Sequence, residues 1–200
     1  MSLISHYKLL DIKDILQLLK EICIQLENEN IKMDLTIIGG ATMLYYFPNH
    51  ITHRTQDIDA IFNNQELIQR NADAIRESWK DNNRGMLSKY WINNEVVVSD
   101  NVLPHYCNLN RHLWDQSTKN VKIYFVSKEC LLASKAMAVV ERQQTKDIDD
   151  FKALCNELKI DNIDKILNIF HKYWSDKQLL NIEFNKNKFI KIWSEVLDIK

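Results

Sequence analysis

The chain has 200 residues, which is enough for one hydrophobic core and too few for two comfortable domains. Its 26 Lys and Arg residues balance 27 Asp and Glu residues, so the overall charge demands neither a nucleic-acid partner nor an anionic membrane. No apolar run reaches the roughly 18 residues of a membrane span, and the scattered cysteines form no CxxC pair, which predicts a cytoplasmic protein with free thiols.

The spacing of apolar residues predicts helices and strands along the whole chain. In the first 80 residues these are a helix from Leu9 to about Glu27, a strand at Leu35 to Ile38, a helix from Ala41 to Phe47, a strand at Asp57 to Phe62 and a helix from the cap Asn63 to about Lys80. Beyond them are strands at Glu95 to Ser99 and Val121 to Val126, a long helix after Ser127 toward Leu158, a helix from Asp161 to Tyr173 and a last helix from Asn185 to Leu197. In residues 104–118 the apolar residues show neither helical nor strand spacing.

This order of elements predicts an α+β fold. A small mixed sheet of about four or five strands packs against helices, and the C-terminal part is all-helical. Residues 1–158 are expected to form the main domain, and residues 159–200 a helical extension of the same domain. The five tryptophans are too widely spread for a base-stacking platform, so we expect them in the core.

A glycine pair marks the turn between the first strand and the helix that follows it. Only three glycines occur in the chain, and two of them, Gly39 and Gly40, are neighbours at this turn. Glycines here let backbone N–H groups approach phosphate oxygens at a helix N-terminus. Together with Thr42, the turn is predicted to bind a nucleotide.

Two acids follow in the next predicted strand. Asp57 and Asp59 are two residues apart, and the strand period of two places both carboxylates on one face of the sheet. Acids held this close repel each other, and a divalent cation relieves the repulsion. Arg54 either neutralises the acid pair or contacts phosphate. The simpler alternative is two solvated acids on an exposed strand.

These motifs together resemble a known family. The glycine pair, Arg54 and the triplet Asp57-Ile58-Asp59 resemble the signature of the minimal nucleotidyltransferase fold, above all that of the bacterial AbiEii-type nucleotidyltransferases. A second block of residues on the predicted long helix is similar to the same family: Leu131, Lys135, Ala138, Arg142, Lys146, Asp147, Asp150 and Phe151. Trp91-Ile92-Asn93 is similar to a feature of some relatives.

The resemblance implies transfer of a nucleoside monophosphate from a nucleoside triphosphate to a hydroxyl of RNA, tRNA or a protein, in a toxin–antitoxin or phage-defence system with a cognate partner. The residues that would hold the triphosphate are Gly39, Gly40, Thr42, Arg54 and Lys135. Asp57 and Asp59 would bind Mg²⁺ or Mn²⁺, and these acids with Lys135 would be catalytic. The competing hypothesis is a catalytically inactive binding protein on the same fold, such as an antitoxin or a partner subunit.

Two-metal nucleotidyl transfer also requires a third carboxylate on a neighbouring strand. The predicted strand at residues 121–126 contains no acid. The remaining acids at the edges of elements are Asp100, Asp115 and Glu129, and none matches the family's third position. Catalytic competence is therefore less well supported by the sequence than the fold.

On a single long helix, charged residues would form one stripe. Arg142, Lys146 and Asp149 fall within about 40° of Lys135 on the helical wheel. A charged stripe is usually a solvated face. The resemblance assigns Lys135 to phosphate and leaves the others near it, Arg142, Lys146, Asp147 and Asp150, as structural ion-pair partners.

Other groups of residues support weaker hypotheses. His105, Cys107 and His112 would supply three zinc ligands without a fourth. His50 and His53 flank the acid pair and are either substrate contacts or solvated loop residues. The chain contains no Walker A loop, no G-x-S-x-G elbow and no H-E-x-x-H helix, which disfavours ATPase and hydrolase functions.

Overall fold

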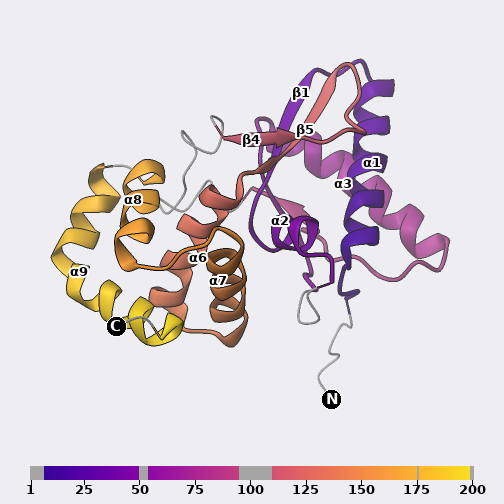
Figure 1. Cartoon of the computed structure of the whole chain (residues 1–200). Coiled ribbons are helices and arrows are strands. Elements are labelled where there is room, and N and C mark those ends of the chain that lie inside the picture. Colours follow the sequence, from indigo (N-terminus) through magenta and orange to yellow (C-terminus); the bar gives the residue numbers. More distant parts are fainter. Residues whose placement is uncertain (1–6, 50–53, 95–109, 175, 199–200) are drawn as a thin grey trace. The chain divides into compact units, whose positions relative to one another are not determined.

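A computed structural model of the chain describes residues 7–49, 54–94, 110–174 and 176–198 (Figure 1). The chain divides into two compact units, Met1–Asp100 with His112–Phe125 and Asn101–Arg111 with Val126–Lys200. Its first elements, in chain order, are α1 (Ile12–Asn28), β1 (Met33–Ile37), α2 (Gly39–Tyr46), β2 (Ile58–Ile61), α3 (Gln65–Asp81), β3 (Ile92–Asn93), β4 (Arg111–Leu113) and β5 (Val121–Val126). They are followed by α6 (Lys128–Arg142), α7 (Thr145–Glu157), α8 (Ile163–Tyr173) and α9 (Asp176–Leu197).

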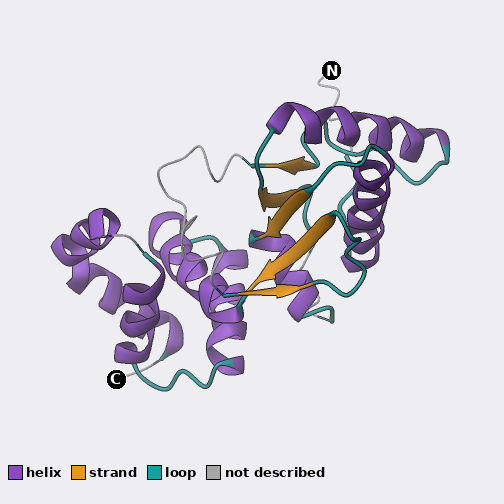
Figure 2. Cartoon of the chain, turned by 90° about the horizontal axis from the view of Figure 1, so that it is seen from above, coloured by secondary structure: helices purple, strands orange, loops and turns teal. Residues whose placement is uncertain are grey.

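The five strands form one mixed sheet in the order β3-β2-β1-β5-β4 (Figure 2). β1 pairs in parallel with β5 and antiparallel with β2, and β2 pairs in parallel with β3. The predicted α+β class and mixed sheet are therefore confirmed. Because β2 returns antiparallel to β1, the start of β2 lies at the sheet end where β1 gives way to α2.

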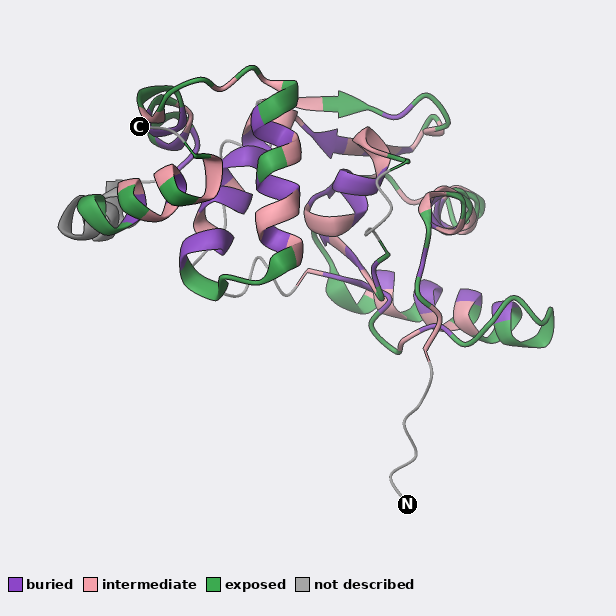
Figure 3. Cartoon of the chain, turned by 60° about the horizontal axis from the view of Figure 1, so that its bottom comes forward, coloured by how far each residue is buried: buried purple, intermediate pink, exposed green. Residues whose placement is uncertain are grey.

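Alternate strand positions divide the sheet into two faces. Leu35 and Ile37 on β1, and Ile123 and Phe125 on β5, are fully buried in the core that α1, α2 and α3 complete. The helices carry buried and exposed faces along the same ribbon (Figure 3). The strand period of two turns the intervening residues, Asp59 on β2 among them, to the other face. Along β2 the side chains accordingly alternate between the buried Ile58 and Ala60 and the half-buried Asp59 and Ile61.

The second unit is built from α6, α7, α8 and α9. Two tryptophans attach its later part to α6: Trp174 Nε1 donates to the carbonyl oxygen of Ala133 at 3.3 Å, and Trp193 Nε1 to that of Ala136 at 3.0 Å. All five tryptophans are buried, which confirms their predicted core role. No helix within the described ranges is long and apolar enough to cross a membrane.

The prediction of one helix from Ser127 toward Leu158 is wrong. The helix ends at Arg142 because Gln143 adopts a left-handed backbone conformation with φ of 51°, and Gln144 is extended. Neither glycine nor proline marks this break, so it carries no conventional helix stop signal. The break allows α7 to pack against α6, and the single charged stripe drawn along one helix does not exist.

Smaller differences concern the ends of elements. The cap of α3 is Asn64, whose Oδ1 accepts from Leu67 N, and not Asn63. α9 begins at Asp176, earlier than predicted, and β4 lies in the segment where no period was found. The strand predicted at residues 95–99 lies outside the described residues, just after the short β3.

Candidate active site

The turn from β1 into α2 brings a glycine directly against an acid. Gly39 has a φ of +61°, a left-handed conformation that L side chains rarely adopt. A Cβ added to Gly39 would lie 2.6 Å from Asp59 Oδ2, closer than any side chain tolerates. The backbone conformation and the approach of the carboxylate both favour glycine at this position.

The backbone holds this approach in place. Ile38, the residue before α2, donates its N–H to the carbonyl oxygen of Asp59 at 2.9 Å. Thr42 is fully buried, and its hydroxyl donates to the carbonyl oxygen of Ile37 at 2.8 Å. The Thr42 side chain thus fixes the first turn of α2 onto the end of β1.

The two acids differ in their local structure. Asp59 lies within β2, whereas Asp57 comes just before the first strand residue, Ile58. Asp57 Oδ1 accepts from the hydroxyl of Thr55 at 3.0 Å, and Thr55 is itself buried and bridged to Leu10. Both acids are half-buried, while the nearby Arg54 is exposed. The structure therefore places Gly39, Asp57 and Asp59 at one end of the sheet. The predicted strand from Asp57 begins instead at Ile58, so the strand period that predicted one face for both carboxylates applies to Asp59 and not to Asp57.

A buried carboxamide lies next to the acid pair. β3 pairs in parallel with β2, and Asn93 is the partner of Asp59 in this register. Residues paired across strands point to the same face. Asn93 is 4% exposed, and its Nδ2 donates to the carbonyl oxygen of Tyr90 at 3.4 Å. The sequence pattern drew attention to Asn93 but gave it no role, because the contact depends on strand pairing.

The third carboxylate is not found among the described residues. Asp115 is exposed in a loop, and Asp100 lies outside the described ranges. Glu129, in the second unit, accepts from Lys172 Nζ at 2.6 Å and from the Tyr173 hydroxyl at 3.1 Å. The Lys172 hydrogen bond holds the pKa of Glu129 below its ordinary value. Within the same described ranges, no cluster of three or more His, Cys, Asp or Glu side chains is arranged to hold a metal ion.

Lys135 belongs to the second unit and lies in a buried ion-pair cluster. Its side chain is 8% exposed, and its Nζ is 2.5 Å from Asp150 Oδ2 and 3.3 Å from Asp147 Oδ1. Arg142 Nη2 lies 3.0 Å from the same oxygen of Asp147. Arg142, Asp147 and Asp150 are thus ion-pair partners as predicted, and Lys135 is a member of the same cluster. Its predicted contact with phosphate stays a prediction.

Cysteine and histidine chemistry receives little support. Cys23, Cys130 and Cys155 are buried thiols outside any disulfide, as predicted for these three residues. Burial raises the pKa of the Cys23 thiol to about 11 and that of Cys155 to about 12, so neither is a ready nucleophile. His50, His53, His105 and Cys107 lie outside the described residues, and the exposed His112 makes an edge contact with the Tyr46 ring.

Gly39→Ala is expected to damage the acid site more than the fold. The new methyl group would displace the Asp59 carboxylate, so Mn²⁺ affinity measured by calorimetry should fall at least about tenfold, with a stability loss of about 1–3 kcal/mol. Gly85→Ala is the matched control, because Gly85 also has a positive φ of +105° but meets only the flexible Lys8 side chain. It should lose stability and keep Mn²⁺ affinity. Equal losses of Mn²⁺ affinity in both variants would contradict the prediction that Asp59 binds a divalent cation.

Comparison with known proteins gives one family match. A protein-family model described as "Nucleotidyltransferase of unknown function (DUF6036)" matches residues 13–195. Among solved structures, the chain is similar to the crystal structure of an antigenic nucleotidyltransferase-like protein from Paracoccidioides brasiliensis. That likeness has a TM-score of 0.47 and 13% sequence identity, and it covers 92% of this chain and 95% of that chain. No curated protein sequence matches the chain.

Proposed function

Because the chain belongs to the family of nucleotidyltransferases of unknown function (DUF6036), we propose that it moves a nucleoside monophosphate from a nucleoside triphosphate to a hydroxyl acceptor. The observation that carries this proposal is the contact between the turn and the acid. The Gly39 backbone, which begins a helix, lies against the Asp59 carboxylate. A triphosphate on the turn would therefore place its phosphates beside the acid pair.

The donor set of this site suits a hard divalent cation. Asp57 and Asp59 supply half-buried carboxylates, and Asn93 supplies a buried carboxamide beside Asp59. Oxygen ligands of these kinds are those that Mg²⁺ and Mn²⁺ take in proteins. We assign Asp57 and Asp59 as the metal ligands, with Asn93 as a neighbouring oxygen donor. When bound, the metal would lower the pKa of the acceptor hydroxyl and neutralise charge on the phosphates.

The protein groups bind and orient the triphosphate. The backbone N–H groups of Gly39 and Gly40 are at the N-terminus of α2, where unpaired donors and the helix dipole favour phosphate oxygens. Thr42 holds that turn through its bond to Ile37, and the Thr55 hydroxyl orients Asp57. Arg54 adds a positive charge close in sequence to the acids. Pre-oriented groups of this kind stabilise charge that develops during transfer.

Lys135 is assigned to the same charge on the phosphates, in keeping with the AbiEii-type pattern. For this role its ammonium group would exchange a carboxylate of Asp147 or Asp150 for a phosphate oxygen. The acceptors that the resemblance implies are RNA, tRNA or a protein hydroxyl, in a toxin–antitoxin or phage-defence system. The alternative is an inactive binding protein, and the lack of an acid in β5 favours it.

The direct test incubates the protein with each α-labelled nucleoside triphosphate, Mg²⁺ or Mn²⁺, and bulk RNA. Label in RNA identifies a nucleic-acid acceptor, and label on the protein identifies a protein hydroxyl. Metal-dependent label in either fraction is the expected result. Binding of the triphosphate without transfer to any acceptor would favour the inactive binding protein.

A further inference from the structure

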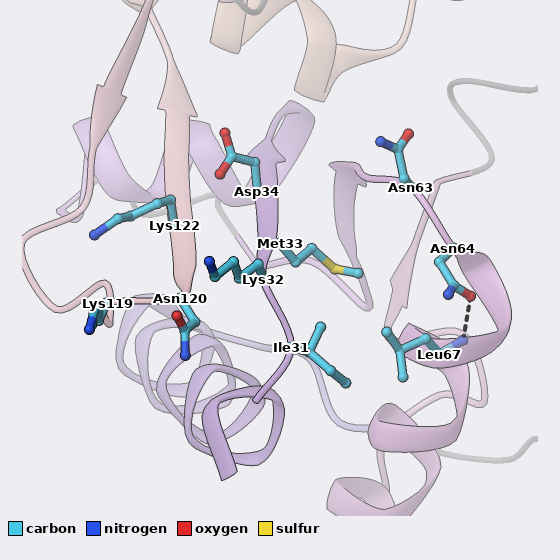
Figure 4. A pocket seen from close by; sticks show the side chains of 10 residues that line it. All are labelled: Ile31, Lys32, Met33, Asp34, Asn63, Asn64, Leu67, Lys119, Asn120 and Lys122. Atoms are coloured by element: carbon cyan, nitrogen blue, oxygen red, sulfur yellow. Dashed lines mark hydrogen bonds between the residues drawn. The ribbon is translucent and has the colours of Figure 1, made fainter. Parts of the chain in front are cut away.

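A polar cavity opens at the end of the sheet opposite to the acid pair. It has a volume of about 820 Å³ and lies in the first unit, between the starts of β1 and β5 on one side and the start of α3 on the other (Figure 4). None of the residues assigned to triphosphate or metal lines it. A cavity of this size falls within the range of about 300–1,000 Å³ that holds small organic ligands.

The cavity carries an excess of positive charge. Lys32, Lys119 and Lys122 line it against a single acid, Asp34, and Figure 4 shows the lysines on the side of the two strands. Lys122 Nζ donates to the carbonyl oxygen of Thr118 at 2.7 Å. Lys32 and Lys119 are exposed, and within the described part of the chain neither forms a salt bridge. Their ammonium groups are accordingly available to an anionic ligand.

A hydrogen-bonded carboxylate fixes the loop that carries Lys119 on this side of the cavity. Glu27 of α1 accepts hydrogen bonds from the Thr118 hydroxyl and, at 3.1 Å, from Asn120 N. The Thr118 hydrogen bond, together with the charges of Lys119 and Lys122, holds the pKa of Glu27 below its ordinary value. Glu27 thus stays ionised and ties the loop before β5 to α1. The lysines project from a fixed loop, which reduces the entropy lost on binding.

The opposite wall supplies amides and apolar surface. Asn64 uses its Oδ1 to cap α3, which leaves its amide N–H group able to donate into the cavity, and Asn63 lies beside it (Figure 4). Met33 and Leu67 add apolar surface between the amides and the lysines. Cations suit phosphate, while amides and apolar side chains suit the sugar and base. An acidic peptide would pair with the lysines but would cover less of the apolar surface than a sugar and base would.

The cavity is aligned with the acid pair. Asp34 at its edge and Ile38 beside Asp59 lie four residues apart on the β1 segment, on the same face of the sheet. At about 3.3 Å per strand residue, the separation is about 13 Å. A nucleic-acid strand of a few nucleotides spans this length.

We propose that this cavity binds the phosphodiester backbone of a single-stranded nucleic acid whose end presents the acceptor hydroxyl to the acid pair. That the bound strand supplies the acceptor hydroxyl rests on the proposed function. Binding of the strand to the cavity does not depend on it. The site takes phosphate through Lys32, Lys119 and Lys122, and a sugar or base through the amide wall.

The test is fluorescence anisotropy with a fluorescein-labelled RNA of about 12 nucleotides, a length within the range that single-strand sites cover. It uses the full chain carrying Asp57→Asn and Asp59→Asn, so that no transfer occurs. Lys32→Gln with Lys119→Gln should weaken binding about tenfold or more at low salt. The slope of log affinity against log salt should fall by about 1.4, since each contact with a single strand contributes about 0.7.

The matched control is Lys13→Gln with Lys20→Gln, which removes the same charge from exposed positions on α1. It should bind RNA nearly as well as the parent. Equal losses in both pairs would overturn the proposal, because bulk charge would then explain binding. Displacement of RNA by a poly-glutamate peptide of equal charge would also overturn it, in favour of an acidic protein segment.

The same variants separate this proposal from the proposed function. The two double lysine variants are also made in the chain that retains Asp57 and Asp59, and both are assayed for nucleotidyl transfer. Failure of transfer in every variant, with the difference in RNA binding preserved, sinks the proposed function and leaves the nucleic-acid site in place. Transfer to RNA with unchanged RNA binding in Lys32→Gln with Lys119→Gln sinks only the nucleic-acid site.

Discussion

Asp57→Asn combined with Asp59→Asn is expected to reduce metal-dependent nucleotidyl transfer at least about 1,000-fold while the protein stays folded. The double variant loses two negatively charged metal ligands and with them several kcal/mol of transition-state stabilisation. About 4 kcal/mol corresponds to about three powers of ten in rate. Stability should be unchanged or higher, because the mutual repulsion of the acids is removed. Transfer kinetics with labelled triphosphate and thermal unfolding are the two measurements.

The matched control is Asp81→Asn with Glu66→Gln, which removes two exposed acids from the same unit. It should keep both activity and stability, since surface charges of this kind contribute little. A double variant of Asp57 and Asp59 that keeps full transfer activity would rule out the metal-site assignment. Loss of activity in the control would point instead to a general effect of charge.

Lys135→Met is expected to destabilise the protein by about 3–5 kcal/mol, as measured by denaturant unfolding. The change leaves the carboxylates of Asp147 and Asp150 without their shared ammonium group, and a buried charge without its partner is costly. Asp150 is fully buried and loses its 2.5 Å contact with Lys135, and Asp147 keeps its contact with Arg142. Lys165→Met, which removes an exposed ion pair with Asp161 just before α8, is the control and should change stability little.

A second variant separates structure from catalysis at Lys135. Lys135→Met combined with Asp150→Asn removes both members of the shorter pair and should recover most of the lost stability. If transfer activity stays low in this double variant although its stability has recovered, Lys135 acts on the phosphates. If activity returns with stability, its role is to hold α6 to α7. Failure of the second change to restore stability would contradict the ion-pair account itself.

The sequence predicts the first half of the fold well because its signals there are local. The period of two places Leu35 and Ile37 in the core, and the helical period of α1 is strong enough to read without a partner. The break at Gln143 carries no such signal. A glutamine adopts a left-handed conformation there because the packing of α7 on α6 stabilises it, and packing between distant elements cannot be read from a local window.

In the candidate site too, local motifs could be predicted from the sequence, whereas contacts between distant elements could not. Gly39, Asp57 and Asp59 form a motif of fixed spacing, so the sequence predicts that they meet. Asn93 lies opposite Asp59 only because β3 pairs with β2, and no spacing in the sequence specifies this pairing. The partners of Lys135 depend on the unpredicted break, because a continuous helix would carry Asp147 and Asp150 away from it.

The alternation along β2 couples the acids to the interior of the protein. Asp57 and Asp59 flank Ile58, whose side chain is fully buried in the core. The carboxylates consequently acquire their positions when the core packs, and a ligand does not have to supply the free energy of ordering this strand. Folding and preorganisation of the site are one event. A change of packing around Ile58 would therefore reach both acids without altering either of them.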